Sequence, residues 1–210
     1  MMTPKKISTG PLPYLLHTPD TDVSVPLILF LHGSGERGDD LVHVGDEGLP
    51  EILASSPEAV IIAPQCPEDT RWTDHLDALE SILDEVIARY RIDKGRVYLT
   101  GLSLGGQGAW FLAARAPERF AALVPICGRS DSEAADRLKD VPTWVFHGAD
   151  DDTVPSNESE KIVSALQAVS GNVKLTVYPD TGHDSWTRAY SEPEMYTWMF
   201  SQRRAGQAGT

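Results

Sequence analysis

The stretch Val97-Tyr98-Leu99-Thr100-Gly101-Leu102-Ser103-Leu104-Gly105-Gly106 decides the fold that we predict for this chain. Its first half belongs to an apolar run, Arg96–Thr100, whose composition is typical of a strand. Its second half opens a helical run, Leu104–Ala116, that stops before Pro117. A strand that turns so sharply into a helix forces the residue at the turn, Ser103, into strained backbone geometry, and small flanking residues prevent clashes.

Further apolar runs alternate with helical patterns along the rest of the chain. Several of them, such as Leu27–Leu31, are continuously apolar, which is typical of strands covered on both faces of a parallel sheet. The alternation predicts the α/β class, with a three-layer, doubly wound, mostly parallel sheet and no large lid. We expect a single domain over residues 1–210, with a frayed tail at 203–210. The expected strands are Tyr14–His17 at an edge, Val25–His32, Ala59–Pro64, Arg96–Thr100, Ala121–Ile126, Val141–His147 and Val173–Tyr178, and the expected helices are Leu76–Tyr90, Leu104–Ala116, Pro155–Val169 and Ser185–Gln202.

Composition restricts the possible partners and compartments. The 210 residues carry a net charge of −13, which argues against nucleic acids and anionic membrane surfaces as partners. No apolar run approaches the roughly 20 residues that span a bilayer, and no apolar signal-peptide core follows the N-terminal lysines, so we expect a soluble, cytoplasmic protein. The composition gives no indication of the oligomeric state.

The two cysteines, Cys66 and Cys127, each follow an apolar run. We interpret them as small buried thiols, although a disulfide between them stays open at this point. Because the sequence has neither a CxxC pair nor a Cys/His cluster, we expect no metal site. We expect no cofactor either.

The chain contains a candidate nucleophilic serine, and candidates for the acid and the histidine that it needs follow it along the sequence. Gly101–Gly105 spells G-x-S-x-G, which would present Ser103 at the mouth of the sheet, below a helix N-terminus. Serine needs a base and the base needs an orienting acid, and on such a fold they follow as Ser, acid, His on loops after strands. His183 follows the last predicted strand and is the candidate base. The acid is one of the three consecutive residues Asp150, Asp151 and Asp152.

Two other histidines, His32 and His147, precede a glycine at the end of a predicted strand. We expect both to hold backbone groups rather than to act as a base.

An oxyanion hole requires two backbone N–H groups aimed at one point. One is expected from Leu104, directly after the nucleophile, and the other from the loop His32-Gly33-Ser34-Gly35 after the first parallel strand. The same loop spells G-x-G-x-x-G over Gly33–Gly38, so dinucleotide binding is a competing hypothesis. Against it, the acidic residues in and after this loop would repel a pyrophosphate. We interpret the neighbours Glu36 and Arg37 as a pair that fixes the loop, with substrate contact as the alternative.

Taken together, the motifs resemble those of the alpha/beta hydrolases over nearly the whole chain. The chain is similar to the compact phospholipase/carboxylesterase group, including dienelactone-hydrolase-like and predicted peptidase-like esterases. The pattern HGxxDxxVP falls on His147–Pro155 and implies Asp151 as the acid of the triad. The resemblance also implies the Ser34 and Leu104 amides as the oxyanion hole. It is carried by Leu31–Gly38, Val97–Gly106, Pro117–Ala122 and Pro125–Gly128.

The resemblance implies a serine carboxylesterase that works through a Ser103-His183-Asp151 triad and an acyl-enzyme. Since no insertion supplies a large lid, we expect small soluble esters with short acyl or aryl groups, including feruloyl-type conjugates. Trp72 and Trp186 are candidate walls of the substrate pocket, with ordinary packing as the alternative. A lysophospholipase or acyl-protein thioesterase is the alternative enzyme. A catalytically silent binding protein on the same fold is the alternative from another class.

Overall fold

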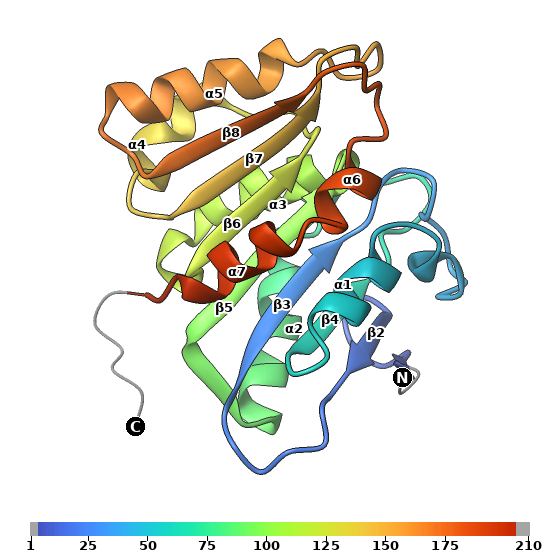
Figure 1. Cartoon of the computed structure of the whole chain (residues 1–210). Coiled ribbons are helices and arrows are strands. Elements are labelled where there is room, and N and C mark those ends of the chain that lie inside the picture. The colour runs from blue at the N-terminus through green and yellow to red at the C-terminus, as the bar shows by residue number, and fades with distance from the viewer. Residues whose placement is uncertain (1–3, 205–210) are drawn as a thin grey trace.

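The computed structural model describes residues 4–204, in which an eight-stranded sheet runs through the centre of the molecule (Figure 1). The strand order is β1-β2-β4-β3-β5-β6-β7-β8. Strands β3 to β8 are parallel, whereas β1 and β2 form an antiparallel edge. The predicted doubly wound, mostly parallel sheet is therefore confirmed. The strands are β1 Lys5–Ile7, β2 Tyr14–His17, β3 Val25–Leu31, β4 Val60–Pro64, β5 Ile92–Leu102, β6 Ala122–Ile126, β7 Thr143–Gly148 and β8 Val173–Tyr178.

The chain changes direction across the sheet between β3 and β5. Strand β4 lies on one side of β3, and β5 returns to pair with its other side, with Leu31 opposite Gly101. The loops that leave β3 and β5 therefore diverge, which opens a crevice at the carboxyl ends of these two strands. In open α/β sheets this crevice is where ligands bind, and Ser103 follows the end of β5.

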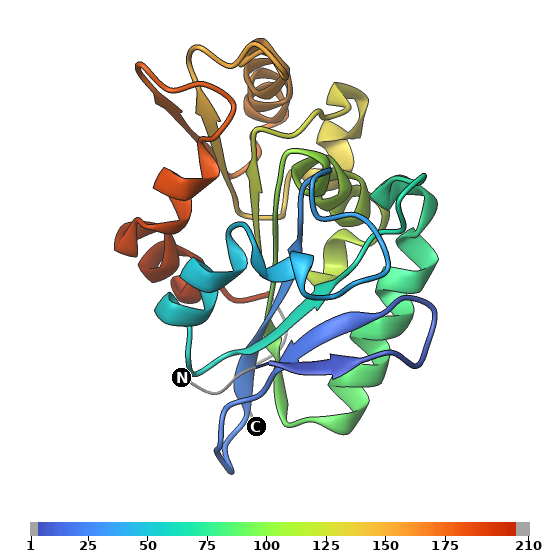
Figure 2. The same cartoon turned by 90° about the vertical axis from the view of Figure 1, so that its right-hand side faces the viewer.

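Helices cover both faces of the sheet (Figure 2). Alternate residues of β3 serve the two cores: Leu29 belongs to the core that includes residues of α2, α3 and α5, whereas Phe30 belongs to the core that includes residues of α1, α6 and α7. This double burial explains the continuous apolar run. Within residues 4–204 no helix is long and apolar enough to cross a bilayer. The helices are α1 Leu49–Ser55, α2 Leu76–Arg89, α3 Leu104–Arg115, α4 Ala135–Leu138, α5 Asn157–Ala168, α6 Trp186–Tyr190 and α7 Pro193–Ser201.

Two local predictions differ from the structure. The last expected helix, Ser185–Gln202, is two helices, because Pro193 has no N–H to continue the first one and instead begins α7. The predicted frayed tail is held at its start: Arg203 pairs with Asp93 at 3.0 Å, and the backbone N–H of Arg204 donates to the Gly95 carbonyl. The rest of that tail, 205–210, lies outside the described residues.

Candidate active site

Ser103 occupies the sharp turn between β5 and α3. Its φ of 51° and ψ of −112° lie in a region that side-chain-bearing residues rarely adopt, at a cost of about 1–3 kcal/mol. Backbone bonds maintain this geometry: the Ser103 N–H donates to the Ile126 carbonyl at 2.9 Å, and the Gln107 N–H donates to the Ser103 carbonyl at 3.0 Å. The turn therefore fixes the direction of the Ser103 side chain through the main chain, as the sequence predicted.

The glycines on either side of Ser103 allow the backbone to pack more closely than any side chain would permit. A Cβ at Gly105 would lie 1.8 Å from the Leu31 carbonyl oxygen, and a Cβ at Gly101 would lie 2.4 Å from the Gly105 oxygen. The first turn of α3 therefore rests directly on the end of β3, so the nucleophile candidate and the loop after β3 lie side by side.

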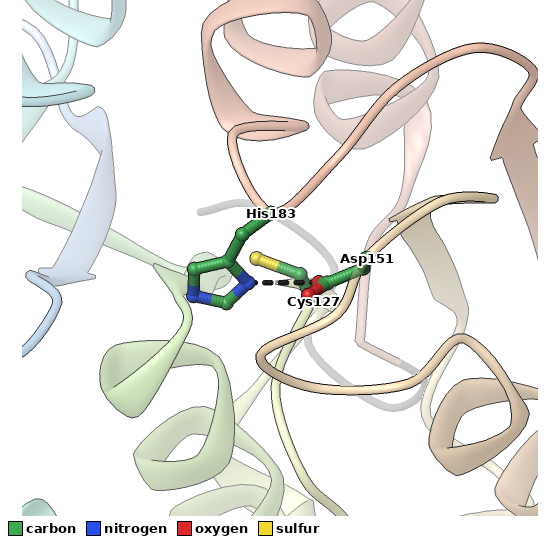
Figure 3. Close-up of side chains that lie close together, drawn as sticks. All are labelled: Cys127, Asp151 and His183. Carbon is green, nitrogen blue, oxygen red and sulfur yellow. Dashed lines mark hydrogen bonds and ion pairs between the residues drawn. The ribbon is translucent and has the colours of Figure 1, made fainter.

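Ser103, His183 and Asp151 form one continuous chain of hydrogen bonds. The Ser103 hydroxyl lies 2.9 Å from His183 Nε2, and His183 Nδ1 lies 2.8 Å from Asp151 Oδ2. The imidazole points at the carboxylate in Figure 3. Because a carboxylate only accepts, the imidazole proton belongs on Nδ1, which leaves the Nε2 lone pair facing the Ser103 hydroxyl. This is the protonation state that lets a histidine take a proton from serine.

Asp151 is the one of the three consecutive acids whose side chain turns inward. Asp150 and Asp152 are exposed, whereas the Asp151 carboxylate is fully buried. Burial opposes its ionisation, but hydrogen bonds from His183 and from the Val154 and Thr153 amides prevail and lower the pKa of Asp151. The carboxylate is therefore ionised at neutral pH, although it lies out of contact with water.

His147 supports the loop that carries Asp151. Its Nε2 lies 2.7 Å from the Val154 carbonyl oxygen and so carries the proton, while Nδ1 accepts from the Ser159 hydroxyl at 2.7 Å. The expectation that His147 holds backbone is confirmed. Its second contact was not predicted: Nε2 also lies 3.2 Å from Asp151 Oδ2, where it can share its proton with the carboxylate.

Cys127 lies beside Asp151 and His183, and Figure 3 shows its side chain next to the bond between them. Potential metal-ligating atoms of these three residues lie within 4.8 Å of one another. His183 and Asp151 are already hydrogen-bonded to each other, and burial raises the pKa of the Cys127 thiol to about 12. A metal would therefore have to break the His183–Asp151 hydrogen bond and displace the thiol proton of Cys127. Cys66 and Cys127 are both free and buried, as interpreted from the sequence.

The loop after β3 brings the predicted oxyanion donors to Ser103. Ser34, Leu104 and Ser103 line one hollow of about 250 Å³. Leu104 is the first residue of α3, so its N–H has no acceptor within the helix. Within residues 4–204 the Ser34 N–H donates to no other group either. Two free amides beside one hydroxyl are the arrangement that an oxyanion hole requires.

Buried side chains hold this loop from below. His32 Nδ1 donates to the Gly33 carbonyl at 2.6 Å, and its Nε2 accepts from the Cys66 amide at 3.0 Å, so His32 holds backbone as expected. Trp72 is fully buried, and its indole N–H donates to the His32 carbonyl at 3.0 Å. Trp72 therefore supports the loop and does not line the hollow, whereas the sequence suggested that it forms a wall of the substrate pocket.

Arg37 also holds the loop, through donors to the Ser34 and Thr70 carbonyls at 3.1 and 3.2 Å. It makes no ion pair with Glu36, whose carboxylate instead lies 3.6 Å from His32 Nδ1. The loop-fixing role of both residues agrees with the sequence, but their pairing with each other does not.

Trp186, the other predicted wall of the substrate pocket, lies next to His183, the candidate base. Its ring meets the His183 ring edge-on at 5.3 Å, and its indole N–H donates to Glu47 Oε2 at 2.9 Å. The side chain is only partly buried, so it is open to a bound molecule next to His183. Its contact with substrate remains a prediction.

Solved structures share this architecture. A thermostable esterase superposes with a TM-score of 0.86 and 34% identity over 96% of this chain and 63% of its own length. Est1E from Butyrivibrio proteoclasticus superposes with a TM-score of 0.74 and 15% identity, covering 96% of this chain and all of Est1E. At that identity Est1E shows the fold alone. The alpha/beta hydrolase fold that the motifs suggested is thereby confirmed.

Sequence comparison adds a curated relative and a family. The bifunctional acetylxylan esterase/xylanase XynS20E of Neocallimastix patriciarum is 26% identical over 82% of this chain, which spans only 26% of the length of that relative. Residues 64–197 match the dienelactone hydrolase family, and this span includes Ser103, Asp151 and His183. By that match over more than half of its length, and by the fold around it, the chain belongs to the dienelactone hydrolase family.

Proposed function

We propose that the chain is a serine carboxylesterase that hydrolyses small esters with short acyl or aryl groups. The observation that carries the proposal is the unbroken hydrogen-bond chain from Ser103 through His183 to the buried Asp151. Its placement in the crevice at the carboxyl ends of β3 and β5, next to two free amides, supports an ester carbonyl as the reacting group.

In the proposed mechanism His183 takes the proton of Ser103 while Oγ attacks the ester carbonyl carbon. The Ser34 and Leu104 amides stabilise the oxyanion, and Asp151 stabilises the imidazolium that forms. As the carbon–oxygen bond to the alcohol breaks, His183 passes its proton to the leaving oxygen. Water then attacks the acyl-enzyme with its proton going to His183, and the release of Ser103 with that proton restores the starting state.

The size and lining of the hollow favour short esters. At about 250 Å³ it is smaller than the roughly 300–1,000 Å³ typical of sites for drug-sized ligands. Its lining is largely polar and charged, which suits a small group better than the long acyl chain of a lysophospholipase or acyl-protein thioesterase substrate. The family match and the esterase relatives support the ester bond as the one that is cleaved.

The proposal is tested by labelling with a fluorophosphonate and by the kcat/KM for p-nitrophenyl acetate and p-nitrophenyl octanoate. Wild type should be labelled and should prefer the acetate, whereas Ser103→Ala should lose both labelling and hydrolysis. Ser81→Ala, which removes an exposed hydroxyl on α2 that donates to the Asp77 carbonyl, should keep both. An unlabelled wild type would favour a silent binding protein, and a preference for octanoate would favour the lysophospholipase or thioesterase alternative.

A further inference from the structure

The Asp151 carboxylate is completely enclosed, and four N–H groups surround it. Its Oδ1 accepts from the Thr153 and Val154 amides at 3.0 and 2.9 Å, and its Oδ2 accepts from His183 Nδ1 at 2.8 Å. The fourth group is His147 Nε2, which lies 3.2 Å from the same Oδ2, and both of these side chains are fully buried. Because a carboxylate offers about four lone-pair sites and water does not reach this one, His147 occupies the last site.

The surroundings of His147 fix the proton of its ring on Nε2. That nitrogen faces two acceptors, the Val154 carbonyl oxygen at 2.7 Å and the Asp151 carboxylate, so it must donate. On the other side of the ring, Nδ1 lies 2.7 Å from the hydroxyl of Ser159, a buried residue in the first turn of α5. A hydroxyl can donate to Nδ1, whereas a carbonyl or a carboxylate cannot donate to Nε2, so the ring keeps one orientation and one tautomer.

A single row of polar contacts therefore runs from α5 to the proposed nucleophile. Its members, in order, are Ser159, His147, Asp151, His183 and Ser103. The backbone also brings the loops after β7 and β8 together, because the Asp150 N–H donates to the Thr181 carbonyl at 2.9 Å. What His147 adds to that bond is a second donor on the carboxylate oxygen that faces His183.

This second donor restricts where Asp151 Oδ2 can lie. On one side Oδ2 is bound by the base, and on the other it is held by a ring that is itself bound to α5 and to the loop after β7. Without His147, that oxygen would have His183 as its one partner among the described residues and could move with it. A misplacement of about 1 Å can cost about 10²-fold in rate, so a contact that positions a catalytic group matters even where it touches no substrate.

We propose that His147 is a positioning residue for the reaction, which holds Asp151 Oδ2 in line with His183 through its Nε2–H. This inference rests on the proposed esterase function and deepens it. His147 is fully buried and does not line the hollow, so it acts through Asp151 and touches no substrate. Its loss should therefore lower kcat and leave KM unchanged. If His147 only supported the loop through the Val154 carbonyl, its loss would lower stability and leave kcat unchanged.

Three variants separate the two roles. His147→Phe keeps a flat ring but removes both nitrogens, and its kcat for p-nitrophenyl acetate should fall at least about tenfold with KM within about twofold. His147→Gln can place its amide nitrogen where Nε2 lies and should recover kcat to within about threefold of wild type. Ser159→Ala is the matched control, because it removes the contact at the other ring nitrogen and leaves Nε2–H on Asp151. It should unfold at a lower urea concentration and keep kcat within about twofold.

A proton NMR signal reports the contact without any substrate. The Nδ1 proton of His183 is bound to a buried carboxylate and should give a signal at low field. In His147→Phe this signal should shift, or be lost through exchange with water, because its acceptor has lost a second donor. In His147→Gln and in Ser159→Ala it should stay at the wild-type position. An unmoved signal in His147→Phe would overturn the proposal.

The outcomes distinguish this inference from the function on which it rests. Wild-type kcat in folded His147→Phe, or an equal loss of kcat in Ser159→Ala, would overturn the positioning role and leave the esterase intact. If His147→Phe does not fold, His147→Asn replaces it: the shorter amide reaches only the position of Nδ1, so its kcat should fall below that of His147→Gln. Equal kcat values for these two amides would then overturn the role. A wild type that neither hydrolyses the acetate nor reacts with a fluorophosphonate would remove the esterase itself.

Discussion

Asparagine in place of Asp151 has one favourable orientation in this site. The Oδ1 position of Asp151 accepts the Thr153 and Val154 amides at 3.0 and 2.9 Å, so the amide oxygen of the asparagine must stay there. The reverse orientation would place an NH₂ group against two N–H donors, at a cost of about 1–3 kcal/mol for each unsatisfied group. The NH₂ group therefore faces His183 Nδ1.

That orientation changes the proton on the base. Because the NH₂ group donates, His183 Nδ1 must accept, and the imidazole then carries its proton on Nε2, opposite the Ser103 hydroxyl. A histidine in this form has no lone pair for the serine proton. In a serine-protease triad the same change lowers kcat about 10⁴-fold. At 1.36 kcal/mol per tenfold change in rate, this corresponds to about 5 kcal/mol of transition-state stabilisation.

The assay is kcat/KM on p-nitrophenyl acetate at pH 7.5, with the fold of each variant checked by circular dichroism. Asp151→Asn should lose about 10⁴-fold. Asp150→Asn and Asp152→Asn remove the same charge from exposed side chains next to it and should stay within about twofold of wild type. Retention of a tenth of the activity by Asp151→Asn, or an equal loss in either neighbouring variant, would contradict this role for Asp151.

Two further predictions concern stability. Hydrogen bonds lower the pKa of Asp151 in the folded state, so the stability that the ionised carboxylate contributes is present above about pH 5 and fades as the pH falls towards 3. The difference in unfolding free energy between wild type and Asp151→Asn, measured by urea titration, should therefore narrow over that range. A constant difference would contradict it. Gly105→Ala places a Cβ 1.8 Å from a carbonyl oxygen of β3 and should cost at least about 3 kcal/mol, more than the usual overpacking of a core. Gly45→Ala meets nothing within 4 Å and should melt like wild type, and equal melting temperatures for the two variants would count against the close-approach argument.

The sequence was most informative where structure is local or follows from strand order. The turn at Ser103 could be predicted because a strand, a glycine-flanked serine and a helix follow one another directly. His183 and an acid after β7 could be predicted because parallel strands end at one edge of the sheet, which brings loops that are distant in sequence together. The choice of Asp151 among three neighbours needed the family pattern, since the direction of a side chain in a loop is set by contacts that the sequence does not display.

Other features depend on tertiary contacts and escaped prediction. Trp72 was expected at the pocket, but the loop after β4 turns it inward to the His32 carbonyl. The division of the last helix had a signal in Pro193 that the apolar pattern on both sides obscured. Arg71 and Arg129, which line the hollow beside Ser103, follow different strands and form no motif. A search for cations in every loop after a parallel strand would have found them.

The close packing around Ser103 distinguishes a rigid part of the candidate site from a more open part. The position of Ser103 and of the Leu104 amide is set by main-chain bonds and by glycines that admit no side chain, and buried side chains hold the loop that carries the Ser34 amide. Arg71 and Arg129, which also line the hollow, instead project from loops at the open edge and are exposed, so substitutions there disturb little of the packing. The proposed reaction and the choice among substrates would thus depend on different residues of the chain. New selectivity can therefore be engineered, or can evolve, by changing Arg71 and Arg129 while the glycine-bounded turn is inherited unchanged.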